Sequence, residues 1–202
     1  GAAISAQPVT IYEPLLHVGK SYVTKDACSA TLYQFNFNAG NATGWSPSGT
    51  WSVANGVYRQ TGTGADARSF AGTQTWTDYS YSFMMRAVTS TTGSIGGYVR
   101  QNSSTTTDDG YLFRWTTSGM ELRRRNTDLS LTPTYSGPLA TTGWVQNRWY
   151  HVEMRVAGSS LEVYVDGVRQ LAVSDSSKTV GRIGLYASGL SSGGVAEFDN
   201  VL

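Results

Sequence analysis

The sequence has almost no net charge, only two histidines and only one cysteine, and the low net charge limits the partners that the protein can bind. Its 202 residues carry 15 basic and 14 acidic side chains, for a formal net charge of +1. That balance provides no overall field for holding a nucleic acid or an anionic membrane, so we expect neither as a partner. The lone Cys28 cannot form an internal disulfide, and we interpret it as a small buried apolar residue.

Long apolar runs are also missing. No run approaches the roughly 18 residues that a membrane-spanning helix requires, and the start, GAAISAQPV, lacks the basic and apolar regions of a signal peptide. That start also fits a mature terminus left after cleavage, or a cut within a longer protein. The chain is nevertheless 40% apolar and 12% aromatic, which indicates a globular protein with a core rather than a disordered chain.

The composition changes near residue 30. Residues 1–30 contain no Trp and no sustained alternation of apolar and polar residues, and we expect an extended arm or an interdomain segment there. In residues 31–202, apolar and polar residues alternate within short segments that are separated by Gly, Asn, Asp or Ser, which is typical of strands and turns. The predicted strands are Tyr33–Phe37, Trp51–Val53, Val57–Gln60, Tyr79–Val88, Gly97–Gln101, Tyr111–Thr116, Met120–Arg124, Trp149–Val156, Leu161–Val165, Arg182–Tyr186 and Ala196–Leu202. No apolar spacing of three and four residues persists, so the pattern predicts an all-β antiparallel sandwich over residues 31–202.

Two turns indicate how strands are joined. Asn55-Gly56 and Asp166-Gly167 place residues that tolerate a positive φ between apolar segments. In the segment 149–167, WYHVEMRVAGSSLEVYVDG, apolar residues alternate on both sides of a Gly-Ser-Ser turn. This hairpin is therefore predicted to turn one face toward the core.

Four motifs occur in a fixed order around that hairpin. FNAGNATGW (37–45) and GTWSVANGVY (49–58) precede it, and GRIGLYAS (181–188) and AEFDNV (196–201) follow it. Over about residues 33–202 this order resembles the laminin-G-like and concanavalin A-like jelly rolls of the bacterial carbohydrate-binding module type. The resemblance implies a jelly-roll sandwich but leaves the function open, because this fold hosts lectins, glycosidases, lyases and adhesion domains as well. The abundance of Ser, Thr, Gly, Tyr and Trp is typical of extracellular proteins that bind polysaccharides, so we expect secretion.

The resemblance also implies a structural Ca²⁺ site. In the related bacterial domains the Asp of the last strand binds the ion together with backbone carbonyls, which here corresponds to Asp199, the carbonyl of Gly56 and an oxygen near Asn36. Oxygen ligands suit a hard cation. Asn36 stands where the family has an acidic pair, so one anionic ligand is missing. The alternative is that Asp199 only hydrogen-bonds to backbone at a strand end.

Arginines are the most distinctive charged residues. Twelve of the 15 basic residues are Arg, and half of these lie between residues 86 and 125. Arg binds carboxylates through two parallel hydrogen bonds and stacks on sugar rings, so this bias favours a uronate or sulfate ligand. Strand alternation predicts a groove lined by Tyr98, Arg100, Arg114, Arg123 and Arg125. The alternative is that these are solvated arginines whose stems cover apolar neighbours.

Tryptophan rings are further candidates for contacts with sugars, because their faces match the apolar C–H faces of pyranoses. Trp144, next to a glycine in a predicted loop, is the strongest candidate, and we also expect Trp76 to be exposed. Trp45, Trp51 and Trp149 stand at positions that the resembling family places in the core.

The residues that a hydrolase or a lyase would need are not grouped in this sequence. Retaining glycosidases on this fold use two carboxylates about 5.5 Å apart, typically from an E-x-D-x-x-E strand, which is absent. A polysaccharide lyase would need Tyr, His and Arg around a uronate. Tyr150, His151 and Arg155 supply these residue types, but the R-x-E-x-R and Q-I-H motifs of such lyases are absent. We therefore predict no catalytic residue.

The leading hypothesis is a monomeric, non-catalytic carbohydrate-binding module that favours acidic polysaccharides. It would accompany a catalytic domain in a secreted enzyme that degrades polysaccharides. Two alternatives stay open, a small lyase acting on a uronate polymer and a laminin-G-like adhesion domain.

Overall fold

The computed structural model describes residues 30–103, 109–125, 131–132 and 142–202, and the regular structure of these residues is entirely β. The chain divides into two compact units, Gly1–Ala30 and Thr31–Leu202, and every described strand belongs to the second. No helix among the described residues is long and apolar enough to cross a membrane. The expected arm over residues 1–30, with Cys28, lies outside the described residues except for Ala30 and stays a prediction.

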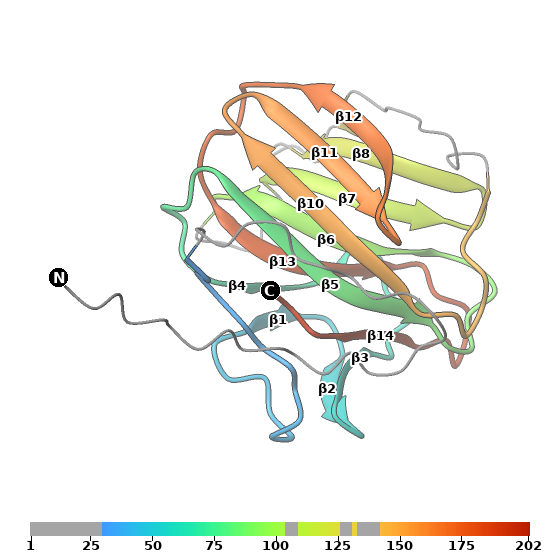
Figure 1. The fold of residues 1–202 in the computed structure, drawn as a ribbon. Helices are drawn as coiled ribbons and strands as arrows, with labels where there is room; N and C mark the ends of the chain where they lie inside the picture. Colours follow the sequence, from blue (N-terminus) through green and yellow to red (C-terminus); the bar gives the residue numbers. More distant parts are fainter. Residues whose placement is uncertain (1–29, 104–108, 126–130, 133–141) are drawn as a thin grey trace, which may run out of the picture. The chain divides into compact units, whose positions relative to one another are not determined.

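The first sheet brings together strands that are far apart in the sequence. Its order is β1-β4-β13-β6-β7-β8-β9, and all of its pairings are antiparallel (Figure 1). These strands are β1 (Ser46–Ser48), β4 (Ala67–Ala71), β6 (Ser94–Gln101), β7 (Gly110–Thr116), β8 (Gly119–Arg125), β9 (Leu131–Thr132) and β13 (Arg182–Ser188).

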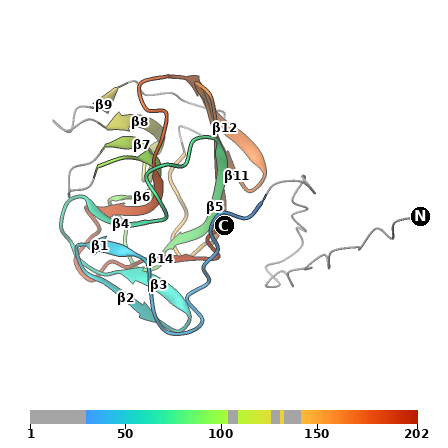
Figure 2. The same cartoon turned by 90° about the vertical axis from the view of Figure 1, so that its left-hand side faces the viewer.

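The second sheet has the order β12-β11-β10-β5-β14-β3-β2 and is also antiparallel. Its strands are β2 (Trp51–Ala54), β3 (Val57–Gln60), β5 (Tyr79–Ala87), β10 (Tyr150–Ala157), β11 (Ser160–Val165), β12 (Val168–Ser174) and β14 (Ala196–Asp199). The two sheets face one another as the layers of a sandwich (Figure 2). The predicted all-β jelly-roll class is confirmed.

One continuous core fills the space between the sheets. Phe83, Phe113, Phe198 and Leu185 are completely buried in it and come from both layers. Strand alternation turns the neighbours of these residues outward, so each sheet has an inner apolar face and an outer face of mixed character.

The two predicted hairpin turns are present. Asn55 and Gly56 have φ values of 55° and 75° between β2 and β3, and Asp166 and Gly167 have 50° and 78° between β11 and β12. These positive φ values explain why Asn-Gly and Asp-Gly occur there, since most other residues are strained in this conformation.

The predicted first strand, Tyr33–Phe37, is shorter than expected. Only Phe35 pairs, with Val201, and the two residues exchange both backbone hydrogen bonds at 2.9 and 2.8 Å. Phe37 then takes a positive φ of 51°, which ends the extended conformation. The chain therefore enters the sandwich beside its own last residues.

Candidate functional site

The outer face of the first sheet carries a second apolar cluster that is separate from the core. Phe70 of β4, Tyr186 of β13, Tyr98 of β6 and Leu112 of β7 form it, and each is at most 4% exposed. The ring of Phe70 meets Tyr98 edge-on at 5.3 Å, and Tyr98 meets Tyr186 edge-on at 5.9 Å. Gly184 makes this packing feasible, because a Cβ there would stand 2.4 Å from the Phe70 ring.

Charged side chains surround this cluster on the same face. We call the outward-facing residues of β4, β13, β6, β7 and β8, together with Asp66, the arginine face. Its charged and aromatic members are Asp66, Arg68, Phe70, Tyr98, Arg114, Glu121, Arg123, Arg125, Arg182 and Tyr186. Five arginines share this face with two carboxylates among the described residues, so the face has an excess of positive charge.

Glu121 fixes two of these arginines. It lies directly across from Arg114 in the β7–β8 ladder, and its Oε2 accepts hydrogen bonds from Nε of Arg114 at 2.6 Å and Nε of Arg123 at 2.7 Å. Burial alone would raise the pKa of Glu121, but the hydrogen bonds from Arg123 and Arg114 outweigh it and lower that pKa below its usual value. The carboxylate stays ionised and orients both guanidinium groups.

Asp66 joins parts of the face that are not neighbours in the sheet. The hydroxyl of Tyr186 donates to Asp66 at 3.0 Å, and Nη1 of Arg125, at the end of β8, lies 3.4 Å from the same oxygen. Asp66 immediately precedes β4, and three strands separate β4 from β8. This contact therefore links the start of β4 to the end of β8 across the arginine face.

The position of Arg100 corrects the predicted groove. Alternation placed its side chain beside Tyr98, but Arg100 has a φ of 51°, and the β6–β13 register shifts between Arg182 and Gly184. Its side chain is 1% exposed and donates to the carbonyls of Thr77, Gly158 and Lys178 and to the carboxylate of Asp78, at 2.7–3.1 Å. Arg100 therefore ties loops together and does not line the face, whereas Tyr98, Arg114, Arg123 and Arg125 share it. Tyr98 and Arg125 are 0% and 3% exposed, so of these four predicted ligand-binding residues Arg114 and Arg123 alone are accessible to a ligand.

The two tryptophans that we expected to be exposed are not. Trp144 is 8% exposed and belongs to the core, so the prediction that it binds sugar from a surface loop is wrong. Trp76 is half-buried and packs against Tyr79, with ring centres 6.0 Å apart. A neighbouring glycine indicated a loop correctly but gave no information on whether that loop folds over the core.

The residues considered for a uronate lyase lie far from the arginine face. His151 and Arg155 are on the outer face of the second sheet, while Tyr150 points into the core. Burial lowers the pKa of His151, and Nε of Arg155 donates to Glu153 at 2.7 Å. The structure thus places His151 and Arg155 on the opposite side of the sandwich from the arginine face, and Tyr150 between the two sheets, where its ring lies 4.5 Å from that of Trp115.

Asp199, the predicted calcium ligand, is a buried carboxylate on the outer side of β14. It is 8% exposed, and its Oδ1 has no hydrogen-bond donor among the described residues. Burial raises its pKa to about 6, against a smaller effect of the hydrogen bond from the Asn200 backbone. The side chain of Asn38 lies against Gly56, and the backbone N–H of Asn38 donates to Asn36.

These observations fit an oxygen-liganded cation, because a buried anionic oxygen without a donor is best compensated by a positive charge. The described residues contain no group of three His, Cys, Asp or Glu side chains suited to a metal. A cation at Asp199 would therefore have at most one further His, Cys, Asp or Glu ligand among the described residues, and neutral oxygens such as those predicted at Gly56 and Asn36 would complete the site. The calcium site stays a prediction.

Comparison with known families decides the classification of the chain. Residues 33–202 match the family described as the 3-keto-alpha-glucoside-1,2-lyase-like domain. The chain belongs to this family. A search of curated protein sequences found no match to this chain.

Solved structures share the fold of this 3-keto-alpha-glucoside-1,2-lyase-like domain at low identity. The carbohydrate-binding module CBM66 from Bacillus subtilis is 20% identical with a TM-score of 0.65, over 80% of this chain and 95% of that one. A Bacillus licheniformis beta-glucanase is 14% identical with a TM-score of 0.61, over 83% and 96% of the two chains. A sialidase is 14% identical with a TM-score of 0.59, and the match covers 84% of this chain but 18% of the sialidase. At these identities the likeness establishes the jelly-roll fold.

Proposed function

We propose that the arginine face binds carbohydrate without cleaving it and favours glycans that carry carboxylate groups. The observation that carries this proposal is the pair Arg114 and Arg123, held side by side on the arginine face by the single carboxylate of Glu121. Guanidinium groups bind carboxylates in a planar, two-point geometry and stack on sugar rings. The positive excess of the face attracts an acidic polymer, and the shared fold with a carbohydrate-binding module supports sugar as the ligand.

The expected affinity is modest and depends on salt. Partly exposed ion pairs contribute about 0.2–1 kcal/mol each, so several arginines must act together. Side chains of Arg114 and Arg123 are 23% and 18% exposed, and added salt screens charges of this kind.

Affinity gel electrophoresis on pectate, alginate and a neutral β-glucan tests this proposal. We expect retardation by the two acidic polymers, and loss of that retardation when Arg114 and Arg123 are both changed to Ala. Arg169→Ala is the matched control, because Arg169 is an exposed arginine of β12 that pairs with Glu162 on the other sheet. Equal retardation by all three polymers would contradict the preference for acidic glycans.

The domain context is part of the same proposal. We propose that the sandwich serves as a targeting module beside a catalytic domain in a secreted protein. A similar fold forms a carbohydrate-binding module, and it also matches a part of a sialidase that makes up 18% of that longer chain. Both likenesses support a modular role. Sequencing of the complete gene, followed by detection of the protein in culture supernatant, tests both parts.

The family description favours a second candidate, a lyase that acts on 3-keto-α-glucosides. A 1,2-lyase removes the proton from C2, which the adjacent C3 carbonyl makes acidic, and expels the substituent at C1. Arginines of the arginine face could stabilise the enolate that forms. Glu121 is a weak candidate for the base because its two arginines lower its pKa.

A chromogenic substrate separates the two candidates. We expect p-nitrophenyl α-glucoside that has been oxidised to the 3-ketone to release nitrophenolate no faster with the protein than without it. Rapid release that is lost in Arg114→Ala would establish the lyase and overturn the non-catalytic proposal.

We also propose that Ca²⁺ binds at Asp199 and links the last strand to the loop that contains Asn36. Its role would be structural, since Asp199 lies on the second sheet while the arginine face belongs to the first. Isothermal titration with Ca²⁺ of chelator-treated protein tests the site, and the absence of binding heat would reject it.

A further inference from the structure

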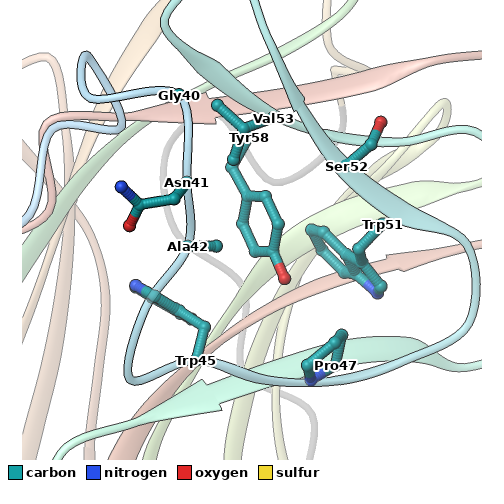
Figure 3. A pocket seen from close by; sticks show the side chains of 9 residues that line it. All are labelled: Gly40, Asn41, Ala42, Trp45, Pro47, Trp51, Ser52, Val53 and Tyr58. Carbon is teal, nitrogen blue, oxygen red and sulfur yellow. The ribbon is translucent and has the colours of Figure 1, made fainter.

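A cavity of about 270 Å³ lies where the 37–45 loop passes the strands β1, β2 and β3. Trp45, Trp51 and Tyr58 line it, and Asn41 stands opposite Trp51 (Figure 3). Trp51 is half-buried, whereas Trp45 and Tyr58 are 7% and 2% exposed and form the buried backing of the cavity. We call this cavity the aromatic pocket. It is lined by residues of the second compact unit alone, at the edge of the second sheet that β2 forms.

The aromatic walls are held rigidly. Nε1 of Trp51 donates to the carbonyl of Ser48 at 3.0 Å, and the Tyr58 hydroxyl shares a hydrogen bond of 3.0 Å with Ser69. The rings of Trp51 and Tyr58 are 4.8 Å apart and inclined by 34°, and Trp45 meets Tyr58 at 5.8 Å and 55°. The Trp51 ring is therefore held in a fixed orientation, so that a ligand placed against it would cost little side-chain entropy.

Polar groups at the rim are neutral. Oδ1 of Asn41 accepts hydrogen bonds from the backbone and the hydroxyl of Thr43, at 3.1 and 2.8 Å, which positions the amide. Ser52, an exposed residue of β2, adds a hydroxyl. None of the lining residues is Arg, Lys, His, Asp or Glu, so the aromatic pocket offers a charged ligand nothing to offset its desolvation.

We propose that the aromatic pocket binds one neutral pyranose ring, as a second sugar site distinct from the arginine face. The half-buried ring of Trp51 matches the C–H face of a pyranose, while the Asn41 amide and the Ser52 hydroxyl match its OH groups. The cavity is smaller than the roughly 300–1,000 Å³ typical of sites for drug-sized ligands, which suits a single terminal ring rather than a chain. The absence of charge in the lining selects neutral sugars, the opposite of the selection proposed for the arginine face.

Nuclear magnetic resonance of the indole N–H groups tests this site directly. The probes are methyl β-glucoside, methyl β-galactoside and methyl α-mannoside, each titrated into the ¹⁵N-labelled protein. We expect at least one to shift the Trp45 and Trp51 indole resonances in a saturable way, with a Kd of the order of millimolar, as expected for a ligand of this size. No saturable shift of these two resonances with any of the three sugars would overturn the proposal.

Ser52→Arg should weaken the binding at least tenfold, because it places a long charged side chain at the rim without touching the core. Ser174→Arg is the matched control: it makes the same change at an exposed position of β12, the opposite edge strand of the same sheet. Equal binding by the two variants would place the sugar elsewhere.

The double variant Arg114→Ala, Arg123→Ala separates this inference from the proposed function. It should keep the indole shifts unchanged, whatever its effect on pectate binding. Loss of the indole shifts in that variant would show that the sugar binds at the arginine face, and would overturn the second site.

Discussion

Both outer faces of the sandwich are rich in arginine, yet their electrostatic characters differ. On the second sheet the arginines lie against carboxylates on their own face, in the pairs Arg59–Glu197, Arg86–Glu197, Arg155–Glu153 and Arg169–Glu162. The first sheet carries five arginines and two carboxylates on its outer face among the described residues, and Arg114, Arg123 and Arg125 pair with Glu121 or Asp66. A count of arginines along the sequence cannot separate the two cases, because strand pairing determines which carboxylates face which arginines.

The two faces also differ in what lies beneath the charges. The arginine face has a buried floor that includes Phe70, Tyr98 and Tyr186. Guanidinium groups lie over aromatic rings on both faces. On the first sheet Arg182 lies 5.0 Å from the Phe70 ring, and on the second sheet Arg86 lies 4.6 Å from the Trp149 ring and Arg155 lies 4.3 Å from the Tyr164 ring. The first sheet remains the proposed binding face because Arg114 and Arg123 share the single carboxylate of Glu121 there.

The largest expected effect concerns Arg100, an arginine of the first sheet that belongs to neither outer face. Arg100→Ala removes hydrogen bonds to three carbonyls and Asp78 from a buried position, and should lower the free energy of unfolding by about 3–5 kcal/mol. Arg169→Ala, on an exposed pair, should cost less than about 1 kcal/mol. Urea denaturation of both variants provides the measurement, and similar midpoints would show that Arg100 is not a structural anchor.

The second effect concerns Asp199, the carboxylate of the second sheet whose Oδ1 has no donor among the described residues. Between pH 4 and 6 the folded protein keeps a proton on Asp199 that the unfolded chain has lost, because the folded pKa is about 6. Without metal, stability should therefore fall as the pH rises through 6, and Asp199→Asn should raise the free energy of unfolding at pH 8 by about 1–3 kcal/mol.

Without metal, Asp199→Asn should be more stable than the wild-type protein at pH 8, and added calcium should reduce or reverse this difference. Calcium should raise the melting temperature of the wild-type protein and leave that of Asp199→Asn unchanged. Thermal melts with Ca²⁺ and with chelator measure both effects. Identical curves for the wild-type protein under the two conditions would leave Asp199 without a role in metal binding.

A third effect compares binding by the two faces directly. The double variant Arg114→Ala, Arg123→Ala should weaken binding to pectate by about 1–2 kcal/mol, roughly five- to thirtyfold, since two ion pairs are lost. The double variant Arg155→Ala, Arg169→Ala removes the same charge from the second sheet and should have no effect. Isothermal titration with oligogalacturonate gives the constants, and equal losses would indicate that only the total charge matters.

The smallest effect concerns the carboxylate between the two arginines. Glu121→Gln keeps an oxygen that accepts their hydrogen bonds but removes one negative charge from the arginine face. Binding of oligogalacturonate should tighten two- to threefold at low salt, or roughly half a kcal/mol, and this gain should disappear at high salt. Glu162→Gln on the second sheet is the control. A loss of binding in Glu121→Gln would instead mean that the glycan itself hydrogen-bonds to Glu121.

The sequence predicted those parts of the fold that depend on local chemistry. Strand β3 and the β10–β11 hairpin match their predicted positions, because alternation and the turn residues Asn55 and Gly56 set their registers. Strand β4 was missed because four of its five residues are buried, which removes the alternation on which the prediction relied. Strand β12 was also missed. It is an edge strand whose pairing with β11 contains a register shift, which disturbs the alternation of apolar and polar residues.

The site could be predicted only in part, because alternation gives the direction of a side chain only where the strand is regular. Alternation placed Arg114, Arg123 and Arg125 on one face correctly, since β7 and β8 pair without a shift. It failed at Arg100, where a single positive φ turns the side chain away. The aromatic pocket was not predicted, because Trp45 and Trp51 were interpreted solely as core residues and no local signal shows that a loop leaves space beside them.

The pairing of Phe35 with Val201 determines how the sandwich responds to mechanical load. In this antiparallel contact, the residues before Phe35 and after Val201 leave from the same end of the pair, and Leu202 bonds to Ser82 of β5 through two further hydrogen bonds. A force applied through both ends would open these bonds one after another, in the manner of a zipper, rather than load them together in shear. The sandwich would then begin to unravel from its last strand, while the strands that carry the arginine face remain paired.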